Sequence, residues 1–336
     1  MHSSSTSYAT NILDRDDEDT YAENRVDHTY HKHVPGRSVR SFLAFFTIRV
    51  HIMLKQSLVS LLLTAAAALA SPIVARAGHN DFTCRSTTHP NPVVLLHGLG
   101  ATYYEDINLL DSYLQGLGFC TFSLTYGAED PGQYVGGLQH VPDSAAQIAA
   151  FVRQVQTNTG ATKVDLVGHS EGAFQTLYVT KFEAGIKDIV QRVVAIAPPT
   201  HGTDFLLYVY ALTYLVAPSL SQPLVKGILD TFGCPACADL VQGADVVNQL
   251  NDGPIAQPGV SYTIIASKAD ELVTPVDTAF VREAGVTNVY VQDFCPLDPA
   301  GHIDEAYDPN VWALVSSSLE DNIHGPAVCV TTFPGK

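Results

Sequence analysis

The stretch Lys163–Thr176, K-V-D-L-V-G-H-S-E-G-A-F-Q-T, decides the fold. Its apolar run, Val164–Val167, stops at Gly168 and is followed by a segment with the character of a helix. The pattern G-x-S-x-G therefore lies between a strand and a helix, which is the setting of a nucleophile elbow. A sharp turn of this kind exposes the Ser170 hydroxyl, and glycine at 168 and 172 leaves room for it. The next helix directs its N-terminus toward the place where negative charge would develop.

The composition is that of a folded chain with a sizeable core. Of its 336 residues, 46% are hydrophobic and 15% are charged, which argues against global disorder. This length suits one large domain or two smaller ones. The formal net charge of −16 argues against nucleic acid or an anionic membrane surface as the main partner.

The N-terminal part differs in character from the rest of the chain. Residues 1–52 are polar, apart from an apolar stretch near their end, and carry mixed charges, which predicts a disordered segment or an extension upstream of the true start. From Met53 onward, a short basic segment is followed by an apolar run (Leu58–Leu69) and a cleavage motif of small residues. This is the order of parts in a secretory signal peptide. We expect a signal at 53–70 and a secreted mature chain from about Ser71. The apolar run is too short for a stable transmembrane anchor.

Cysteine usage agrees with an exported protein. An even number of cysteines beyond a secretion signal favours disulfides, although the sequence alone does not select the pairing. Cys234 and Cys237 form a C-x-x-C pair, which suits a redox or zinc site, but no second such pair lies nearby. A local structural disulfide is therefore favoured. The six cysteines are Cys84, Cys120, Cys234, Cys237, Cys295 and Cys329.

Strand and helix patterns alternate along most of the chain. Asp143 is expected to cap one of the helices. The alternation predicts an α/β fold with a mostly parallel, doubly wound sheet, helices on both faces and a site at the carboxyl ends of the strands. The expected strands are 92–97, 119–126, 164–167, 190–197, 260–267 and 287–294, and the expected helices are 105–116, 143–155, 173–184 and 310–319.

An insertion at about 200–258 breaks this alternation. Residues 205–220 are strongly apolar and rich in tyrosine, which suits either a buried helix or a lid and pocket wall that meets an apolar substrate. Both interpretations remain open. We therefore expect a single catalytic domain at 71–336 that carries a lid-like or cap-like insertion.

The first expected strand runs into His97-Gly98-Leu99-Gly100. A strand followed by H-G-x-G is where α/β-hydrolases place one amide of an oxyanion hole. We expect the main-chain N–H of Leu99 to donate there, together with the N–H of Glu171, the residue after the candidate nucleophile.

A candidate acid follows a later strand. Asp270 lies just past the expected strand 260–267, where a catalytic acid is expected, and Glu271 and Asp277 are its rivals. Glu271 is the more serious of the two because it directly adjoins Asp270.

A candidate base follows the last expected strand. His302 lies in the loop A-G-H-I-D, whereas His201 precedes the acid and His324 lies past the final helix. Ser170, Asp270 and His302 then occur in the chain order of the α/β-hydrolase triad.

From Asn91 onward the chain resembles the secreted class 2 lipases, a family of fungal and bacterial triacylglycerol lipases and esterases within the α/β-hydrolase superfamily. The elbow reads S-E-G-A where S-Q-G-G is common in that family, and S-K-A-D replaces the usual T-R-Y-D. The matching stretches are N-P-V-V-L-L-H-G-L-G, K-V-D-L-V-G-H-S-E-G, C-P-A-C-A-D-L-V-Q-G-A-D-V-V-N-Q-L-N, P-G-V-S-Y-T-I-I-A-S-K-A-D-E-L-V-T-P and A-G-H-I-D-E.

This resemblance implies Ser170 as nucleophile, Asp270 as acid and His302 as base. It favours Asp270 over Glu271, because the family's acid lies directly before E-x-V-T-P. It also implies three disulfides, namely Cys84–Cys120, Cys234–Cys237 and Cys295–Cys329.

The sequence therefore predicts a secreted serine carboxylic-ester hydrolase, most simply a triacylglycerol lipase that works through an acyl-enzyme. We expect a lipid or ester substrate, at a lipid–water interface, and no metal or organic cofactor. The alternatives are a short-chain esterase, a cutinase-like polyester hydrolase, or a non-catalytic secreted binding module with the same fold.

Overall fold

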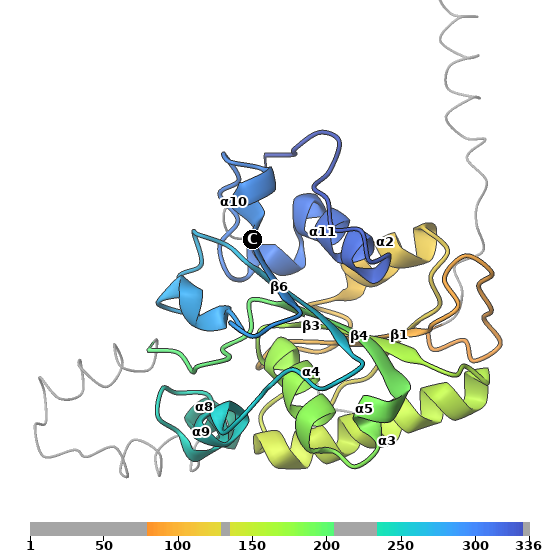
Figure 1. The fold of residues 1–336 in the computed structure, drawn as a ribbon, viewed down its shortest axis with the longest axis horizontal. Helices are drawn as coiled ribbons and strands as arrows, with labels where there is room; N and C mark the ends of the chain where they lie inside the picture. The colour runs from red at the N-terminus through yellow and green to blue at the C-terminus, as the bar shows by residue number, and fades with distance from the viewer. Residues whose placement is uncertain (1–78, 129–134, 205–233, 332–336) are drawn as a thin grey trace, which may run out of the picture. The chain divides into compact units, whose positions relative to one another are not determined.

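Six strands hydrogen-bond side by side in one sheet, in the order β2-β1-β3-β4-β5-β6, and every pairing is parallel (Figure 1). The computed structural model describes residues 79–128, 135–204 and 234–331. The expected segments 1–52 and 53–70, and the apolar stretch 205–220, lie outside the described residues. The strands are β1 (Val93–Leu96), β2 (Thr121–Ser123), β3 (Val164–His169), β4 (Val190–Ile196), β5 (Ser261–Ala266) and β6 (Val286–Tyr290).

Helices cover both faces of the sheet, which confirms the predicted fold class. Helices α2 and α11 lie on one side, and α3, α4 and α5 lie on the other (Figure 1). The helices are α2 (Asn108–Gly116), α3 (Val141–Thr159), α4 (Glu171–Phe182), α5 (Ile186–Ile189), α8 (Pro235–Asp239), α9 (Asp245–Asn251), α10 (Val291–Phe294) and α11 (Pro309–Leu319), with 3₁₀ turns at Val276–Ala279 and Asp304–Ala306.

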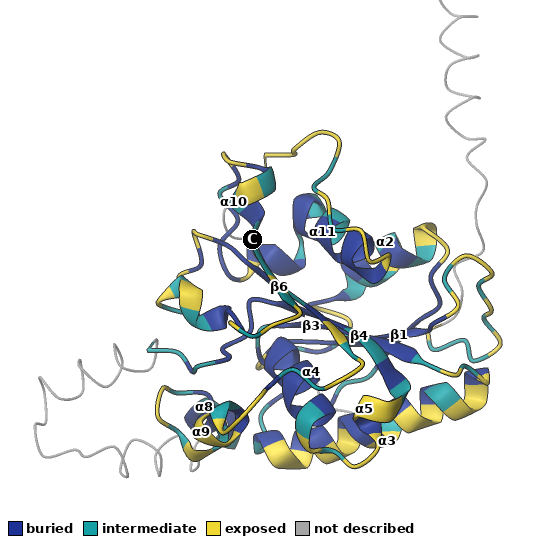
Figure 2. Cartoon of the chain, in the orientation of Figure 1, coloured by how far each residue is buried: buried dark blue, intermediate teal, exposed yellow. Residues whose placement is uncertain are grey.

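Alternation along the strands builds two cores, one on each face. In β1, Val94 and Leu96 pack toward α3 and α4, whereas Val93 and Leu95 pack toward α2 and α11, because successive side chains of a strand point to opposite faces. All four are fully buried. Figure 2 shows β1 and β3 in the buried colour, whereas the edge strand β6 and the outer side of α3 are more exposed. Burial on both faces explains why the strands read as continuous apolar runs.

The order of the strands fixes where a site can form. From β1 the chain moves to one side to make β2, and then crosses back to make β3 on the other side of β1. The helices that follow β1 and β3 therefore diverge, which opens a crevice at the carboxyl ends of these two strands. The H-G-x-G turn follows β1 and the serine elbow follows β3, so both meet at this crevice.

Several element boundaries differ from the expectation: the expected strand 119–126 is limited to Thr121–Ser123 and the expected helix 105–116 begins at Asn108. Two further differences have a clear local cause. Helix α3 begins at Val141, with His140 at its N-cap, so Asp143 lies in the first turn and does not cap the helix. Pro142 suits that first turn, and the N–H of Val141 donates to the carboxylate of Asp239 at 2.9 Å.

The last strand ends at Tyr290, four residues earlier than expected. The carboxylate of Asp293 accepts a hydrogen bond from the N–H of Tyr290 at 3.0 Å, as part of a capping box that starts α10 there.

Three disulfides join Cys84 to Cys120, Cys234 to Cys237, and Cys295 to Cys329. The first ties the segment before β1 to the residue that precedes β2. The third ties the loop after α10 to the C-terminal segment. Within the described ranges, each helix is too short or too polar to cross a bilayer.

Candidate active site

Ser170 lies at the tip of a strained turn between β3 and α4. Its backbone has φ 56° and ψ −121°, a conformation that L-residues rarely adopt and that strand and helix must hold in place. The N–H of Ser170 donates to the carbonyl of Ile196 in the neighbouring strand at 2.8 Å. A Cβ at Gly168 would overlap the carbonyl of Gly172, and a Cβ at Gly172 would overlap the carbonyl of His97. The two glycines are therefore required by close backbone packing.

The structure brings Ser170, His302 and Asp270 into one line. The Nε2 atom of His302 lies 2.7 Å from the Oγ of Ser170, and its Nδ1 lies 2.8 Å from the Oδ2 of Asp270. His302 and Asp270 are both buried. An imidazole placed between a hydroxyl and a carboxylate can take the hydroxyl proton while the carboxylate fixes its tautomer.

The environment of Asp270 separates it from its rivals. Its Oδ1 accepts the main-chain N–H groups of Leu272 and Val273 at 2.8 and 2.9 Å, which leaves Oδ2 for the imidazole. The carboxylate of Glu271 instead accepts the main-chain N–H of His302 at 3.1 Å. Glu271 therefore supports the backbone of the loop, while Asp270 contacts the ring.

The other sequence rivals lie outside this arrangement. Asp277 is an exposed partner of Arg282, with 2.9 Å between their charged groups. The ring of His201 lies 3.0 Å from the carbonyl of Phe280, and the exposed ring of His324 lies 3.0 Å from the carbonyl of the next residue.

The turn after β1 lies beside Ser170 and is fixed on both sides of Gly98. The N–H of Gly98 donates to the carboxylate of Asp106 at 2.7 Å, and its carbonyl lies 2.8 Å from the Nδ1 of His97. In the described part of the chain, no acceptor meets the N–H of Leu99 or the N–H of Glu171. Among the described residues these two N–H groups therefore have no protein acceptor.

His169 and Asp106 form a buried pair that the sequence analysis did not identify. The Nδ1 of His169 lies 3.0 Å from Asp106, and its Nε2 lies 2.9 Å from the carbonyl of His302. Both partners only accept hydrogen bonds, so both ring nitrogens carry protons and His169 is a cation. Burial opposes this charge, but the carboxylate of Asp106 raises the pKa of His169 above its ordinary value.

Glu305 is a second residue that was missed. It is fully buried, and neither carboxyl oxygen has a hydrogen-bond partner in the described residues. Burial, and then the charges of Asp270 and Glu271, raise the pKa of Glu305 well above its usual value. Potential ligand atoms of Asp270, His302 and Glu305 lie within 4.8 Å of one another, but Asp270 and His302 already bind each other. The raised pKa favours the neutral form of Glu305.

A cavity of about 370 Å³ opens beside Ser170 and His302. Carbon-rich side chains predominate among its walls, which suits the acyl or alcohol part of an apolar ester. The apolar lining comprises Leu99, Ala101, Pro199, Leu240, Leu272, Val273, Ile303 and the ring of Tyr307.

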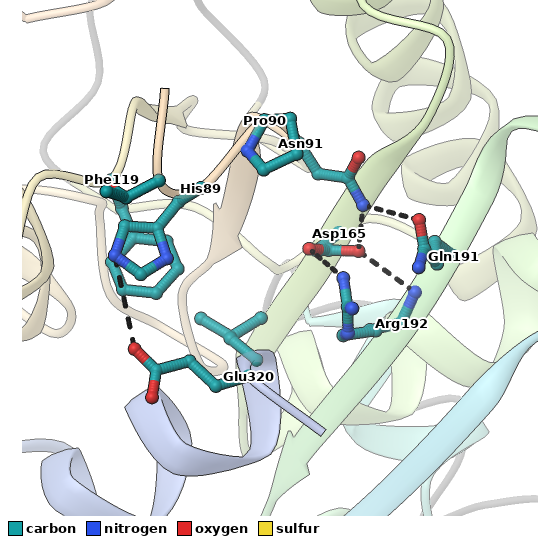
Figure 3. Close-up of a pocket in the computed structure, with 10 residues that line it drawn as sticks. His89, Pro90, Asn91, Phe119, Asp165, Gln191, Arg192 and Glu320 are labelled. Atoms are coloured by element: carbon teal, nitrogen blue, oxygen red, sulfur yellow. Dashed lines mark hydrogen bonds and ion pairs between the residues drawn. The ribbon is translucent and has the colours of Figure 1, made fainter. Parts of the chain in front are cut away.

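A second hollow of about 320 Å³ lies where the strands begin (Figure 3). Its polar groups satisfy one another: Asn91 donates to Asp165 at 3.0 Å and to Gln191 at 2.9 Å, and Arg192 pairs with Asp165 at 3.2 Å. This hollow faces the amino ends of the strands, opposite the crevice where α/β sheets bind ligands. We interpret it as a structural ion-pair network.

Comparison with known proteins identifies the family to which this fold belongs. Residues 93–311 match the alpha/beta hydrolase family, and the chain belongs to that family. A triacylglycerol lipase of Pseudarthrobacter phenanthrenivorans is 31% identical over 145 residues, which is 42% of this chain and 43% of the relative. A triacylglycerol lipase of Burkholderia plantarii is also 31% identical over 145 residues, 42% of this chain and 38% of the relative. The matched part therefore spans less than half the length of either relative.

The solved structures include the crystal structure of Aspergillus fumigatus lipase B. It is similar to this chain with a TM-score of 0.54 and 21% sequence identity, covering 70% of this chain and 53% of that one. At this level of identity the likeness concerns the fold alone.

Proposed function

We propose that the chain is a serine carboxylic-ester hydrolase with Ser170 as nucleophile, His302 as general base and Asp270 as the acid that orients it. The observation that carries this proposal is the continuous hydrogen-bonded line from Ser170 Oγ through His302 to Asp270, with distances of 2.7 and 2.8 Å. The strained elbow and the crevice position agree with it.

In the proposed reaction His302 takes the proton of Ser170 as the oxygen attacks the ester carbonyl. Asp270 stabilises the imidazolium that forms. The main-chain N–H groups of Leu99 and Glu171 hold the oxyanion, and the loss of one such donor typically costs about 3–4 kcal/mol of barrier. His302 then protonates the leaving alcohol, and water hydrolyses the acyl-enzyme by the same steps.

The substrate we propose is a lipid ester, and triacylglycerol is the first candidate. The apolar walls of the cavity next to Ser170 support it, as does the likeness of part of the chain to triacylglycerol lipases. A short-chain esterase or a cutinase-like polyester hydrolase would use the same three residues. Export, with a signal peptide at 53–70 and a mature chain from about Ser71, belongs to the same proposal and is supported by the three disulfides.

The test is an initial-rate series on p-nitrophenyl esters of increasing acyl length, with Ser170→Ala and Ser112→Ala run beside the wild type. Ser112 is an exposed serine on α2 and serves as the matched control. We expect cleavage by the wild type and Ser112→Ala only. A preference for long chains supports the lipase, and a preference for short chains supports the esterase.

Labelling with an active-site fluorophosphonate separates an enzyme from a non-catalytic binding module of the same fold. The wild type should be labelled at Ser170 and the Ser170→Ala variant should not react. Equal labelling of both proteins, or turnover by Ser170→Ala, would overturn the assignment.

A further inference from the structure

A carboxyl group lies buried directly behind the proposed oxyanion hole. Glu171, whose main-chain N–H is one of the two proposed oxyanion donors, is 0% exposed. Its Oε1 accepts a hydrogen bond from Gln175 at 2.9 Å, and its Oε2 lies 2.5 Å from the hydroxyl oxygen of Tyr126. The role proposed for Glu171 above uses only its backbone, so the side chain needs its own explanation.

The protons around Tyr126 can be counted. Its hydroxyl oxygen lies 2.5 Å from Glu171 Oε2 and also 2.5 Å from the carbonyl oxygen of His97. A hydroxyl has one proton to donate, and a main-chain carbonyl only accepts. If Tyr126 donated to an ionised Glu171, two oxygen atoms would face each other at 2.5 Å with no proton between them. Both contacts are satisfied only when Glu171 carries a proton and donates it to Tyr126, which then donates to His97.

We propose that Glu171 is a neutral positioning residue, and that the relay Glu171–Tyr126–His97 holds the turn that carries the Leu99 N–H against the serine elbow. This inference rests on the proposed oxyanion hole. The relay joins Glu171, the first residue of α4, to His97, the first residue of the H-G-x-G turn. It therefore fixes the two proposed donors relative to each other.

The packing around the two rings strengthens this link. The rings of His97 and Tyr126 stack with 4.3 Å between their centroids, and the N–H of Tyr126 lies 3.3 Å from His97 Nε2. His97 Nδ1 contacts the carbonyl of Gly98. The turn is thus held through the backbone and the ring of His97 together.

The charges that face Glu171 favour its neutral form. Burial, and to a smaller extent the carboxylate of Asp239, raise the pKa of Glu171 to about 8 in spite of its hydrogen bonds with Tyr126 and Gln175. Burial lowers the pKa of His97 to about 4, so the ring of His97 offers no positive charge that would stabilise an ionised Glu171. Burial and the nearby Glu171 raise the pKa of Tyr126 well above its ordinary value, and the charge of Asp106 adds to this.

Ionisation of Glu171 would weaken the proposed site in two ways. It would break the hydrogen bond to Tyr126 or the one from Tyr126 to His97, because a proton is lost from the relay. It would also put a second negative charge close to the oxyanion that forms during attack, which opposes transition-state stabilisation. Turnover should therefore fall as the pH rises through the pKa of Glu171.

The experiment measures the ratio of kcat/KM at pH 7 and pH 9 on a p-nitrophenyl ester. If the ionised form is inactive, a single group with a pKa of about 8 gives a fall of about tenfold in the wild type. Glu171→Gln should abolish this fall, since a glutamine amide donates to Tyr126, accepts from Gln175 and never ionises. Glu305→Gln, which removes another buried carboxyl, is the matched control and should retain the fall.

Two outcomes would overturn the inference. One is an alkaline fall of the same size in Glu171→Gln, and the other is a fall that disappears in Glu305→Gln instead. Tyr126→Phe should lower kcat at pH 7 with little change in KM, because it breaks the relay without touching the cavity.

Infrared difference spectroscopy separates a failure of this inference from a failure of the proposed function. In Ser170→Ala, which needs no activity, subtraction of the Ser170→Ala/Glu171→Gln spectrum removes the signal of the neutral Glu305 and should leave a protonated-carboxyl band at pH 6.5 that weakens above pH 8. Absence of that band in Ser170→Ala would overturn the inference even if the wild type cleaves esters. If the band is present but the wild type cleaves no ester, Glu171 is neutral as inferred. Its positioning role would then be overturned together with the proposed function.

Discussion

The ring of His169 donates to the main-chain carbonyl of His302 at 2.9 Å. The residue before the proposed nucleophile therefore holds the backbone of the proposed base. On its other side the same ring binds Asp106, which also accepts the N–H of Gly98. One buried ion pair thus connects the elbow, the loop of the base and the oxyanion turn.

Removal of His169 should be costly. His169→Ala leaves the carboxylate of Asp106 buried without its cation, and breaking a buried pair in this way typically costs about 3–5 kcal/mol. Asp106→Asn should cost less, because an amide oxygen still accepts the N–H of Gly98 and a neutral His169 is tolerated. Urea unfolding of both variants measures the difference. Equal and small losses would show that the pair contributes little.

Asp270 and Glu271 provide a matched comparison of two adjacent carboxylates. Asp270→Asn should lower kcat by about 10⁴-fold, because an amide favours the wrong tautomer of His302. Glu271→Gln keeps an oxygen that accepts the N–H of His302, and its kcat should fall by about tenfold or less. Both are measured by initial rates at saturating ester. The reverse ranking would assign the acid role to Glu271.

Substitution of the elbow glycine should disrupt the fold, whereas a helix glycine should not. A Cβ at residue 172 would overlap the backbone of His97 and Leu96, so Gly172→Ala should lose about 2 kcal/mol or more of unfolding free energy. Gly116 ends α2 with open space around it, and Gly116→Ala should gain up to about 1 kcal/mol. Thermal melts of the two variants test this contrast.

The free energy of unfolding should depend on pH through the ionisation of Glu171. Its pKa is about 8 in the folded chain and 4.5 as an ordinary value, so the folded state binds the proton more tightly than the unfolded state. This contribution to stability is complete below about pH 4.5, and is lost as the pH rises to about 8 and beyond. Glu171→Gln should flatten the unfolding free energy across this window in urea titrations. An unchanged slope in that variant would mean that Glu171 is already ionised when folded.

The disulfides should differ in their contribution to stability. Cys84 and Cys120 are 36 residues apart, whereas Cys234 and Cys237 are 3 apart. Closing a longer loop removes more entropy from the unfolded chain, so the double serine variant of the first pair should lose about 3–4 kcal/mol and that of the second pair clearly less. Chemical unfolding of both variants would detect a reversed order.

Most of the fold could be predicted from local sequence patterns. The apolar runs that end at Gly168 and His97 predicted buried parallel strands, because both faces of such strands are covered and alternation is lost. The errors fell at element ends. Asp143 is a good capping residue by type, but Pro142 and the distant carboxylate of Asp239 started the helix two residues earlier. Asp293 ended β6 by capping a short helix, a competition that strand propensity does not reveal.

The candidate site divides in the same way. Ser170 and His302 could be chosen by their positions after strands. Asp270 was separated from its neighbour Glu271 only by the resemblance to a known family, and the structure brings Ser170, Asp270 and His302 together. Asp106 and Tyr126 could not be chosen, because each acts through contacts with residues far away in the chain. Glu305 could not be chosen either, because nothing in the neighbouring sequence marks a buried polar side chain. His169 lies within the G-x-S-x-G motif. A polar residue at the end of a buried strand indicates a buried hydrogen-bonding role, and His169 could have been identified in this way.

The proposed catalytic groups are contributed by the loops after four different strands, β1, β3, β5 and β6. Such an activity requires the whole sheet, since a chain that stops before β6 has a nucleophile without a base. Turnover should accordingly be the last native property to return during refolding, after helix content and after the single tryptophan, Trp312 in α11, packs against the core. The recovery of ester cleavage would then report when the whole sheet has formed. Proteolytic cleavage in any of these four loops would abolish activity before the protein unfolds.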